Sequence, residues 1–459
     1  MSTNPFLNAP VRDAVTAILQ CGEEILLLHR QPQLAVFAGY EAFPGGKVDT
    51  GDQEHVPTSE VFAGLDSRLL GALTRELREE LALDLAALAA AGEIEHIGRA
   101  GFALTPPLAP LRYAAHFYRI RLRHRPALDV DPREHSGAQW ATPRDWLERY
   151  ADGHLLLALP TLLALRDLAQ SPQLTALPSL IHFANDPYYS GGGIIEIEVL
   201  AGMRQLIVRS NTIPPAAHTN CFLIGDDGAT RLLVDPSPAD DAEYAKLYAQ
   251  VEGRFDVIFL THHHPDHHER ADQLARQTGV PLWLSTDTRQ RITAEQPRFF
   301  DGLETREIAD GENLTRWLGR EVQTLAVPGH DRGQLALMPD DRAWCIVGDL
   351  IQGIGTVVIP PPEGNMAEYF ATLENVIRLD PEVIIPSHGL ALGSTYYLKH
   401  ALSHRQARES QILKLHQAGK SEDEVLATVY VGTPSALLPL ARINIRSHMD
   451  KLRAERRLA

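Results

Sequence analysis

Cysteine and long apolar runs are both scarce in this sequence of 459 residues, and each scarcity narrows the class of protein. The three cysteines, Cys21, Cys221 and Cys345, lie far apart and form no CxxC pair. We therefore expect no disulfide framework and a reducing, cytoplasmic compartment. No stretch approaches the roughly 18 apolar residues of a membrane span, and the N-terminal stretch MSTNPFLNAPVRDA has no signal-peptide core. We predict that the protein does not associate with a membrane.

Net positive charge is also lacking, because 43 Lys and Arg residues stand against 59 Asp and Glu residues, a formal net charge of −16. Such a charge argues against general binding of polyanions, whose phosphates would be repelled. The range 396–459 differs, with 11 basic against 6 acidic side chains. It leaves room for an anionic substrate near the C-terminus, although a basic helical surface more often only contributes solubility.

The hydrophobic pattern divides the chain into three regions and one linker. Residues 11–170 alternate strand patterns with an amphipathic helix over 69–83, which indicates a mixed α/β domain. The Pro-, Gly- and Asn-rich stretch 171–193 is typical of a linker. Residues 194–395 again alternate strands with helices, and 396–459 are helical with a pattern typical of a winged helix. No internal repeat is evident, and nothing in the pattern indicates an oligomeric state.

A dense cluster of metal-type side chains follows the apolar run FDVIFL. His262, His264, Asp266 and His267 bring imidazole nitrogens and a carboxylate together within six residues, and both groups are good zinc ligands. Because the cluster follows a predicted strand, it lies on a loop at the strand's carboxyl end, where several side chains can reach one point. A His-rich loop can also be an accidental chelator, and a lone histidine is more often a satisfied core residue.

Three further candidate ligands favour a built site over an accidental chelator, because each ends an apolar, strand-like run. They are His330 in VPGH, Asp349 in IVGD and His388 in IPSHG. The two other histidines of the cluster, His263 and His268, are expected either to face outward or to support the ligands through hydrogen bonds.

The HxHxDH motif and the three downstream ligands together resemble the metallo-β-lactamase superfamily over the range 194–395. The resemblance implies an α/β fold of the αββα sandwich type with two zinc ions, or manganese or iron, at one edge. It assigns His262, His264 and His330 to the first ion, Asp266, His267 and His388 to the second, and Asp349 as the bridge. Asp266 would also orient the attacking water as a catalytic residue. With its bridging aspartate, the sequence resembles the glyoxalase-II and nuclease branches of the superfamily more than the true β-lactamases.

Three shorter segments resemble the lactamase-like group that contains a human mitochondrial endoribonuclease, in which a helical tail follows the catalytic domain. They are HTNCFLIG at 218–225, LLVDPSP at 232–238 and SHRQARESQIL at 403–413. Related sequences include thioester hydrolases, so both a small-molecule thioester and RNA stay open as substrates. Arg405 and Arg408 would meet an anionic substrate, or they form helix-surface pairs with residues such as Glu409.

The N-terminal region carries a second group of carboxylates, in the segment RELREEL at 75–81 that follows the loop FPGGKVD at 43–49. Glu76 and Glu80 are four residues apart, so they share one helix face and can bind one hard cation with Glu79 beside them. A helix dense in Glu and Arg is usually only a solvated face, but the preceding glycine loop favours a function.

These two segments resemble the Nudix box, GX5EX7REUXEEXGU, of hydrolases that cleave nucleoside diphosphates linked to another group. The resemblance implies an α/β/α sandwich that binds Mg²⁺ or Mn²⁺ through Glu76 and Glu80. Glu76, Glu79 and Glu80 would be catalytic. Arg75 would orient the glutamates by bidentate pairing or contact the substrate.

The box departs from its family pattern at three places. Asp52 stands where the box has a glutamate, Ala82 stands where it has a late glycine, and the 22 residues 53–74 replace its shorter spacer, an insertion of 15. Such an insertion, together with LLLHRQPQLAVFAGYEAFPGG upstream, resembles the Nudix branch that acts on coenzyme A derivatives. Phe37 occupies the usual histidine of that signature.

The leading hypothesis is a bifunctional cytoplasmic hydrolase in which both sites act on a nucleotide derivative such as acyl-coenzyme A, which has a diphosphate and a thioester. An alternative is an RNA-processing endoribonuclease whose basic tail holds the strand, with the N-terminal domain as a nucleotide-binding regulatory module. The altered box also allows a third reading, a non-catalytic ligand-binding domain.

Overall fold

The computed structural model describes residues 10–105, 111–185 and 193–458. By its internal contacts the chain splits into two compact units, Met1–Ala201 and Gly202–Ala459. Each unit is described by itself below. Among the described residues, no helix combines the length and the apolar character that crossing a membrane requires.

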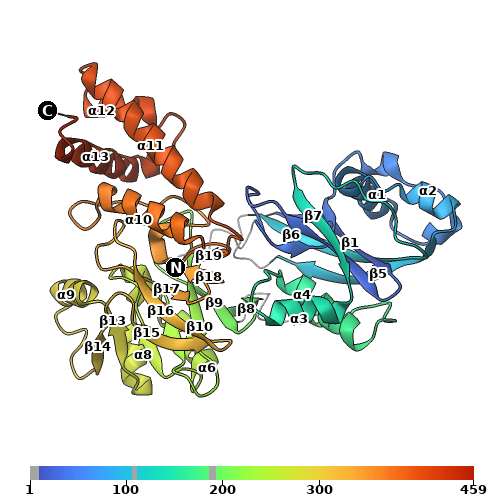
Figure 1. Ribbon diagram of the computed structural model, residues 1–459, viewed down its shortest axis with the longest axis horizontal. Helices are drawn as coiled ribbons and strands as arrows, with labels where there is room; N and C mark the ends of the chain where they lie inside the picture. Colours follow the sequence, from blue (N-terminus) through green and yellow to red (C-terminus); the bar gives the residue numbers. More distant parts are fainter. Residues whose placement is uncertain (1–9, 106–110, 186–192, 459) are drawn as a thin grey trace. The chain divides into compact units, whose positions relative to one another are not determined.

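The first unit is built on one seven-stranded mixed sheet in the order β3-β2-β1-β6-β5, with β4 paired to β1 and β7 to β2 (Figure 1). Its strands are β1 (Val11–Cys21), β2 (Glu24–Arg30), β3 (Glu41–Ala42), β4 (Gly45–Lys47), β5 (Ile94–Leu104), β6 (Arg112–Leu122) and β7 (His135–Ala141). Strands β1 and β6 run parallel in register from Val11 opposite Arg112 to Cys21 opposite Leu122. The sheet therefore has long central strands and short strands at the loop that carries the FPGG segment.

Helix α1 (Ser67–Leu81) covers one face of this sheet. Its leucines recur at helical spacing and pack in one core with residues such as Val15, Leu19 and Leu26. Because successive strand residues point to opposite faces, Ile18 and Leu27 lie on the other face, and they are also fully buried. Helices on both faces thus form the predicted α/β/α sandwich.

The remaining elements of the first unit are α2 (Leu85–Ala90), α3 (Pro143–Ala151), α4 (Leu159–Gln170), α5 (Pro178–Asn185) and β8 (Ile195–Leu200). The indole of Trp146 on α3 donates to the Ile25 carbonyl at 3.2 Å, which fixes this helix against β2. The predicted linker, 171–193, contains α5, and residues 186–192 lie outside the described part of the chain.

The second unit contains two sheets with helices outside them, the αββα arrangement expected from the sequence (Figure 1). The first runs in the order β14-β13-β12-β11-β10-β9 and the second in the order β15-β16-β17-β18-β19. The strands of the first sheet are β9 (Met203–Arg209), β10 (His218–Ile224), β11 (Leu232–Val234), β12 (Val257–Phe259), β13 (Leu282–Leu284) and β14 (Thr305–Glu307). Those of the second are β15 (Asn313–Trp317), β16 (Arg320–Ala326), β17 (Leu335–Pro339), β18 (Trp344–Ile346) and β19 (Val383–Ile385).

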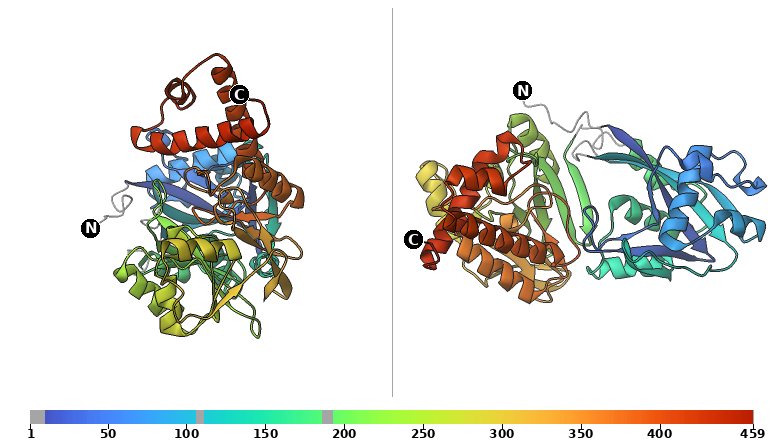
Figure 2. Two further views of the ribbon diagram at one scale, coloured as in Figure 1. Left: turned by 90° about the vertical axis from the view of Figure 1, so that its left-hand side faces the viewer. Right: turned by 90° about the horizontal axis from the view of Figure 1, so that it is seen from above.

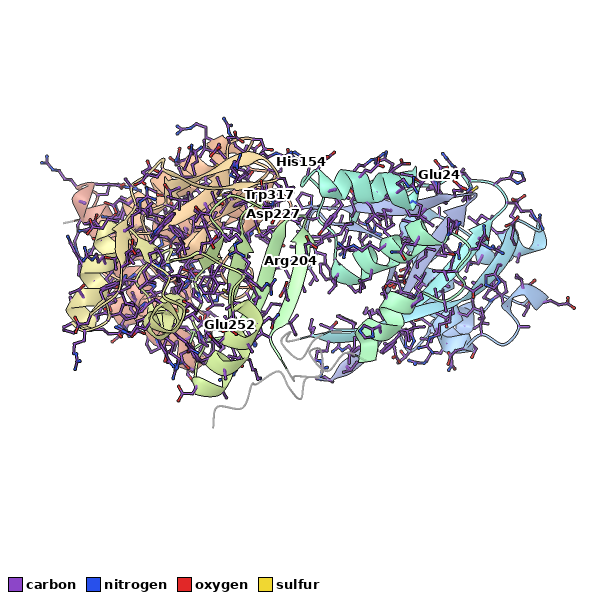
Figure 3. All side chains as sticks on the ribbon, turned by 90° about the horizontal axis from the view of Figure 1, so that it is seen from below. Glu24, His154, Arg204, Asp227, Glu252 and Trp317 are labelled. Atoms are coloured by element: carbon purple, nitrogen blue, oxygen red, sulfur yellow. The ribbon has the colours of Figure 1, made fainter. Side chains whose placement is uncertain are left out.

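Short, wholly apolar strands hold the second unit together. β11, β12, β18 and β19 are buried along their full length, as parallel strands covered on both faces require. Trp317 at the end of β15 (labelled in Figure 3) meets Trp344 of β18 edge-on, with ring centroids 5.5 Å apart. The outer helices are α6 (Asp241–Val251), α8 (Ala271–Thr278), α9 (Thr286–Glu295) and α10 (Met366–Leu379).

A helical tail completes the second unit: α11 (Tyr396–Gln417), α12 (Glu422–Val429) and α13 (Leu438–Ala454), which lie together in Figure 2. Ile412, Val425, Ile445 and Leu452 form its apolar core. Glu409, 5% exposed, is surrounded by His448, Lys451 and Arg457, so its buried charge is compensated.

Candidate functional sites

The predicted metal ligands of the second unit all follow the ends of strands, most of them buried. The histidine loop comes after β12 and continues into the short helix α7 (Pro265–His268). Asp349 and His388 come shortly after β18 and β19, which run parallel, so both lie at the same end of the second sheet. His330 follows β16. The topology therefore brings residues that are 126 positions apart in the chain to one place.

Three imidazoles form the first ligand group. The Nδ1 atom of His264 lies 3.0 Å from the Nε2 atom of His262 and 2.9 Å from the Nε2 atom of His330. Both His262 and His330 are buried. Three nitrogens this close together suit a divalent cation with tetrahedral coordination.

Asp266, His267 and His388 form the second group. The His388 Nε2 atom lies 3.5 Å from an Asp266 carboxylate oxygen, and the His267 Nε2 atom lies 3.8 Å from the other. Asp349 reaches both groups, because its Oδ1 atom is 3.4 Å from His388 and 3.6 Å from His267 while its Oδ2 atom is 3.8 Å from His330. This is the geometry that a bridging ligand requires.

The second group contains three polar atoms that lack a hydrogen-bond partner among the described residues. They are the Nε2 atoms of His267 and His388 and the Oδ1 atom of Asp349, all buried. A buried polar atom with no hydrogen-bond partner or bound cation costs about 1–3 kcal/mol of folding free energy. Because the Asp349 oxygen lies 3.6 Å from the His267 nitrogen and 3.4 Å from the His388 nitrogen, a single divalent cation would satisfy all three atoms together. The residues present therefore fit a two-metal centre.

The electrostatics of the cluster differ between the two ligand groups. Burial lowers the pKa of His330 to about 4 and the pKa of His262 well below its usual range, so both rings are neutral. Burial opposes ionisation of Asp349, but His388 and His267 hold the pKa of that carboxyl well below its usual range. Although burial opposes it, Asp266 and Asp349 raise the pKa of His267 to about 9 and that of His388 well above its usual range. A cation bound by these two rings would therefore displace their protons.

A carboxylate that sequence reasoning missed, Asp235, orients histidines of both groups. One of its oxygens lies 2.9 Å from His267 Nδ1 and accepts the Thr261 hydroxyl at 2.6 Å. The Thr261 hydroxyl oxygen in turn lies 3.0 Å from His262 Nδ1. These contacts fix which nitrogen of each ring faces the metal site. Asp235 follows β11 within LLVDPSP, so the pattern that flagged Asp349 applies to it as well.

His263 and His268 do not face outward, since both are buried. His263 contacts the Asp331 carboxylate through Nδ1, and His268 donates from Nδ1 to the His264 carbonyl at 3.0 Å. Glu363, a further residue that sequence reasoning missed, lies 3.4 Å from the outer nitrogen of His264. These groups support the ligand loop, which agrees with the second of the two expectations.

The first unit brings the Nudix-like segments together on α1. Arg75 places its five N–H groups on four partners: it pairs bidentately with Asp52, at 2.6 and 3.3 Å, and donates to Glu76, Glu79 and the Lys47 carbonyl. Asp52, 1% exposed, thus meets Arg75 despite the inserted residues. With its donors occupied in this way, Arg75 orients carboxylates, and the contacts do not leave it facing a substrate.

The three glutamates of α1 have different surroundings. Burial raises the pKa of Glu76 to about 7, although Arg75 acts in the opposite direction. Glu79 is exposed. Glu80 accepts from the Gly45 backbone N–H at 2.8 Å and lies 3.0 Å from His135 Nε2.

The glutamate face meets the FPGG loop closely. A Cβ atom on Gly46 would lie 2.4 Å from the Glu76 carboxylate, so only glycine allows this approach. Glu80, Glu134 and His135 form a further set that could hold a metal ion. The ligand roles of these groups stay predictions.

Arg405 and Arg408 are engaged within the second unit. Arg405 donates to the Val357 carbonyl at 2.5 Å and stacks 5.0 Å from the Tyr369 ring. Arg408 donates to the Val429 carbonyl and stacks 4.4 Å from the Tyr430 ring. Neither arginine pairs with Glu409 as expected. The partners of Glu409 are instead His448 and Lys451 on α13 and Arg457 after that helix.

Comparison with protein families gives three matches that together span most of the chain. Residues 214–388 match the model of the metallo-beta-lactamase superfamily, and residues 10–157 match that of the NUDIX domain. Residues 421–459 match the beta-lactamase associated winged helix domain.

Individual relatives each align with about half of the chain or less. Beta-lactamase-like protein 2 homolog of Drosophila melanogaster is 28% identical over 52% of this chain and 84% of its own length. Hydroxyacylglutathione hydrolase of Synechococcus is 31% identical over 45% of this chain and 79% of its own length. Atrochrysone carboxyl ACP thioesterase of Aspergillus fumigatus is 24% identical over 42% of this chain and 58% of its own length.

Proposed function

Since this chain is a hydrolase of the metallo-β-lactamase superfamily that also carries a NUDIX domain, we propose that it hydrolyses acyl-coenzyme A or a similar acylated nucleotide derivative at two sites. The second unit would cleave the thioester at a two-metal centre, and the first would cleave the diphosphate. The observation that carries the proposal is the convergence of seven ligands and three unpartnered buried atoms on one point.

Each residue of the second unit has a definite task in thioester cleavage. His262, His264 and His330 would hold one divalent ion, Asp266, His267 and His388 the other, and Asp349 both. Divalent ions at such a site supply an activated water and polarise the scissile carbonyl. Asp266, whose side chain is 16% exposed, is the most open of the carboxylate ligands and orients the attacking water. Zinc suits these ligands, and manganese or iron would also bind them.

The first unit offers the groups that diphosphate cleavage needs. Glu80 and Glu76 would bind Mg²⁺ or Mn²⁺, which neutralises the charge of the diphosphate. A carboxylate of the same helix would assist the attack of water on phosphorus as general base. Arg75 holds Glu76 and Glu79 in place through the contacts described above.

Three observations favour a thioester over RNA at the two-metal centre. A relative of this chain is a thioesterase by name and another hydrolyses hydroxyacylglutathione. The tail arginines that would hold an RNA strand are instead engaged by tyrosine rings and backbone carbonyls. The net charge of −16 also disfavours binding of a polyanion.

The test is incubation of the metal-loaded protein with acyl-coenzyme A, with products identified by mass spectrometry. His264→Ala should abolish release of the free thiol while diphosphate cleavage continues, and Glu80→Ala should do the reverse. His400→Ala on α11 and Glu148→Ala on α3, both at exposed positions, are the matched controls and should leave both activities unchanged.

The remaining outcomes separate the alternatives. Thioester cleavage without any diphosphate cleavage would make the first unit a ligand-binding module. Acyl-coenzyme A that stays intact in every sample would refute the proposed substrate, and steeply salt-dependent cleavage of single-stranded RNA would then support the endoribonuclease alternative.

A further inference from the structure

The segment 356–360 runs beside the metal-ligand cluster without forming a helix or strand. Val357 and Ile359 are buried, so their backbone groups need partners within the protein. The carbonyl of Val358, between them, accepts a hydrogen bond from His330 Nδ1 at 2.7 Å. This bond directs the other nitrogen of His330 toward His264.

The tail provides the partners of this segment. On α13, the Asn444 side chain accepts from the Ile359 N–H at 2.9 Å and donates to the Val357 carbonyl at 3.4 Å. It therefore binds the backbone on both sides of Val358. On α11, Arg405 donates to the same Val357 carbonyl at 2.5 Å.

A second ligand is supported from the same side. The Arg405 guanidinium stacks on Tyr369 of α10, and the Tyr369 hydroxyl donates to the Leu350 carbonyl at 2.8 Å. Leu350 directly follows Asp349 in a single 3-10 turn. Arg405 therefore contacts Val357, which precedes the backbone partner of His330, and Tyr369, which binds the residue after Asp349.

We infer that Asn444 and Arg405 are positioning residues of the metal centre, through which the helical tail sets its affinity for metal. The inference rests on the proposed two-metal site. Asn444 is 3% exposed, and both of its amide atoms are used on this one backbone segment. A residue that served only the stability of the tail would pack in the tail's apolar core, where Leu426 lies.

The test measures metal affinity of the full-length, metal-free protein by zinc competition with a chromophoric chelator, and the visible spectrum after loading with Co²⁺. Asn444→Leu keeps the volume but removes both hydrogen bonds, and we expect it to weaken zinc binding about 10- to 100-fold. Asn444→Asp keeps the acceptor for Ile359 and should lose less. Arg405→Met, at a part-exposed position, should weaken binding several-fold and keeps the test open if Asn444→Leu does not fold.

Leu426→Ala is the matched control, because it loosens the tail core and should leave zinc affinity unchanged while the protein is folded. Wild-type zinc affinity and an unchanged Co²⁺ spectrum in Asn444→Leu and Arg405→Met would overturn the inference. Equal loss in Leu426→Ala would also overturn it, because general loosening would then explain the effect. Failure of the wild type to bind zinc, cobalt, manganese or iron would instead refute the proposed function.

Discussion

At the scale of single residues, Ala82 shows how a departure from a family pattern is accommodated. It ends helix α1 with φ of 54°, in the left-handed region where a Cβ atom is unfavourable. Its N–H still closes the helix by donating to the Arg78 carbonyl at 3.0 Å. The backbone has thus kept the conformation for which the box has a glycine, and the alanine is accommodated with some strain.

We predict that Ala82→Gly stabilises the first unit by about 0.5–1 kcal/mol, because relief of the left-handed strain exceeds the entropy that glycine loses on folding. Urea unfolding at equilibrium measures the change. Ala91→Gly is the matched control: Ala91 also caps a helix and is exposed, but its φ is −77°. Glycine there should destabilise by a similar amount, and a stabilising effect at both positions would contradict the explanation.

At the scale of elements, the tail depends on a buried ionisable contact between α11 and α13. His448 is 1% exposed and its Nδ1 atom lies 3.3 Å from the Glu409 carboxylate. Burial lowers the pKa of His448; Glu409 acts in the opposite direction, while Arg405 and Lys451 add to the lowering. The folded tail therefore holds this ring neutral at a pH where the unfolded chain would protonate it.

We predict that the tail loses stability as the pH falls below about 6.5, the ordinary value of histidine, because only the unfolded chain then takes up the proton. The pKa of Glu409 is lowered, so this carboxylate stays ionised over the same range. Hydrogen exchange of α11–α13 at pH 7 and pH 5.5 measures the effect. His448→Gln keeps a donor but cannot titrate, and it should reduce the difference between the two pH values. If the variant keeps the full difference, another group is responsible.

The sequence predicted the elements that depend on local pattern, and it singled out candidate ligands that the fold brings together. Asp349 and His388 each follow a short strand that is buried along its full length, which leaves little choice about where the apolar run ends. Contacts between distant segments could not be predicted in this way. The pairing of Asp52 with Arg75 spans an insertion, and Asn444 meets its partners 85 and 87 residues earlier in the chain. Only the folded arrangement reveals contacts of this kind.

At the scale of the whole molecule, each of the two units carries its own candidate metal site. The ligands differ in kind, since histidines dominate in the second unit and carboxylates in the first. Imidazole nitrogen suits zinc, whereas carboxylate oxygen suits magnesium. We therefore expect zinc to bind the second unit and magnesium to bind the first.

We predict that zinc added to the metal-free protein raises the thermal transition of the second unit and leaves that of the first unchanged. A ligand present at a concentration 100 times its dissociation constant stabilises the folded state by about 2.7 kcal/mol. Scanning calorimetry readily detects a change of this size. His264→Ala should remove most of the shift. A shift of both transitions, or one that persists in this variant, would show that zinc binds elsewhere.

The position of Asp235 restricts how this metal centre can evolve. One carboxylate serves His267 directly and His262 through Thr261, so both halves of the centre depend on a single side chain. A substitution there alters the two ion sites in one mutational step. A change of metal preference confined to one half of the proposed centre would therefore have to come from the ligands themselves rather than from Asp235.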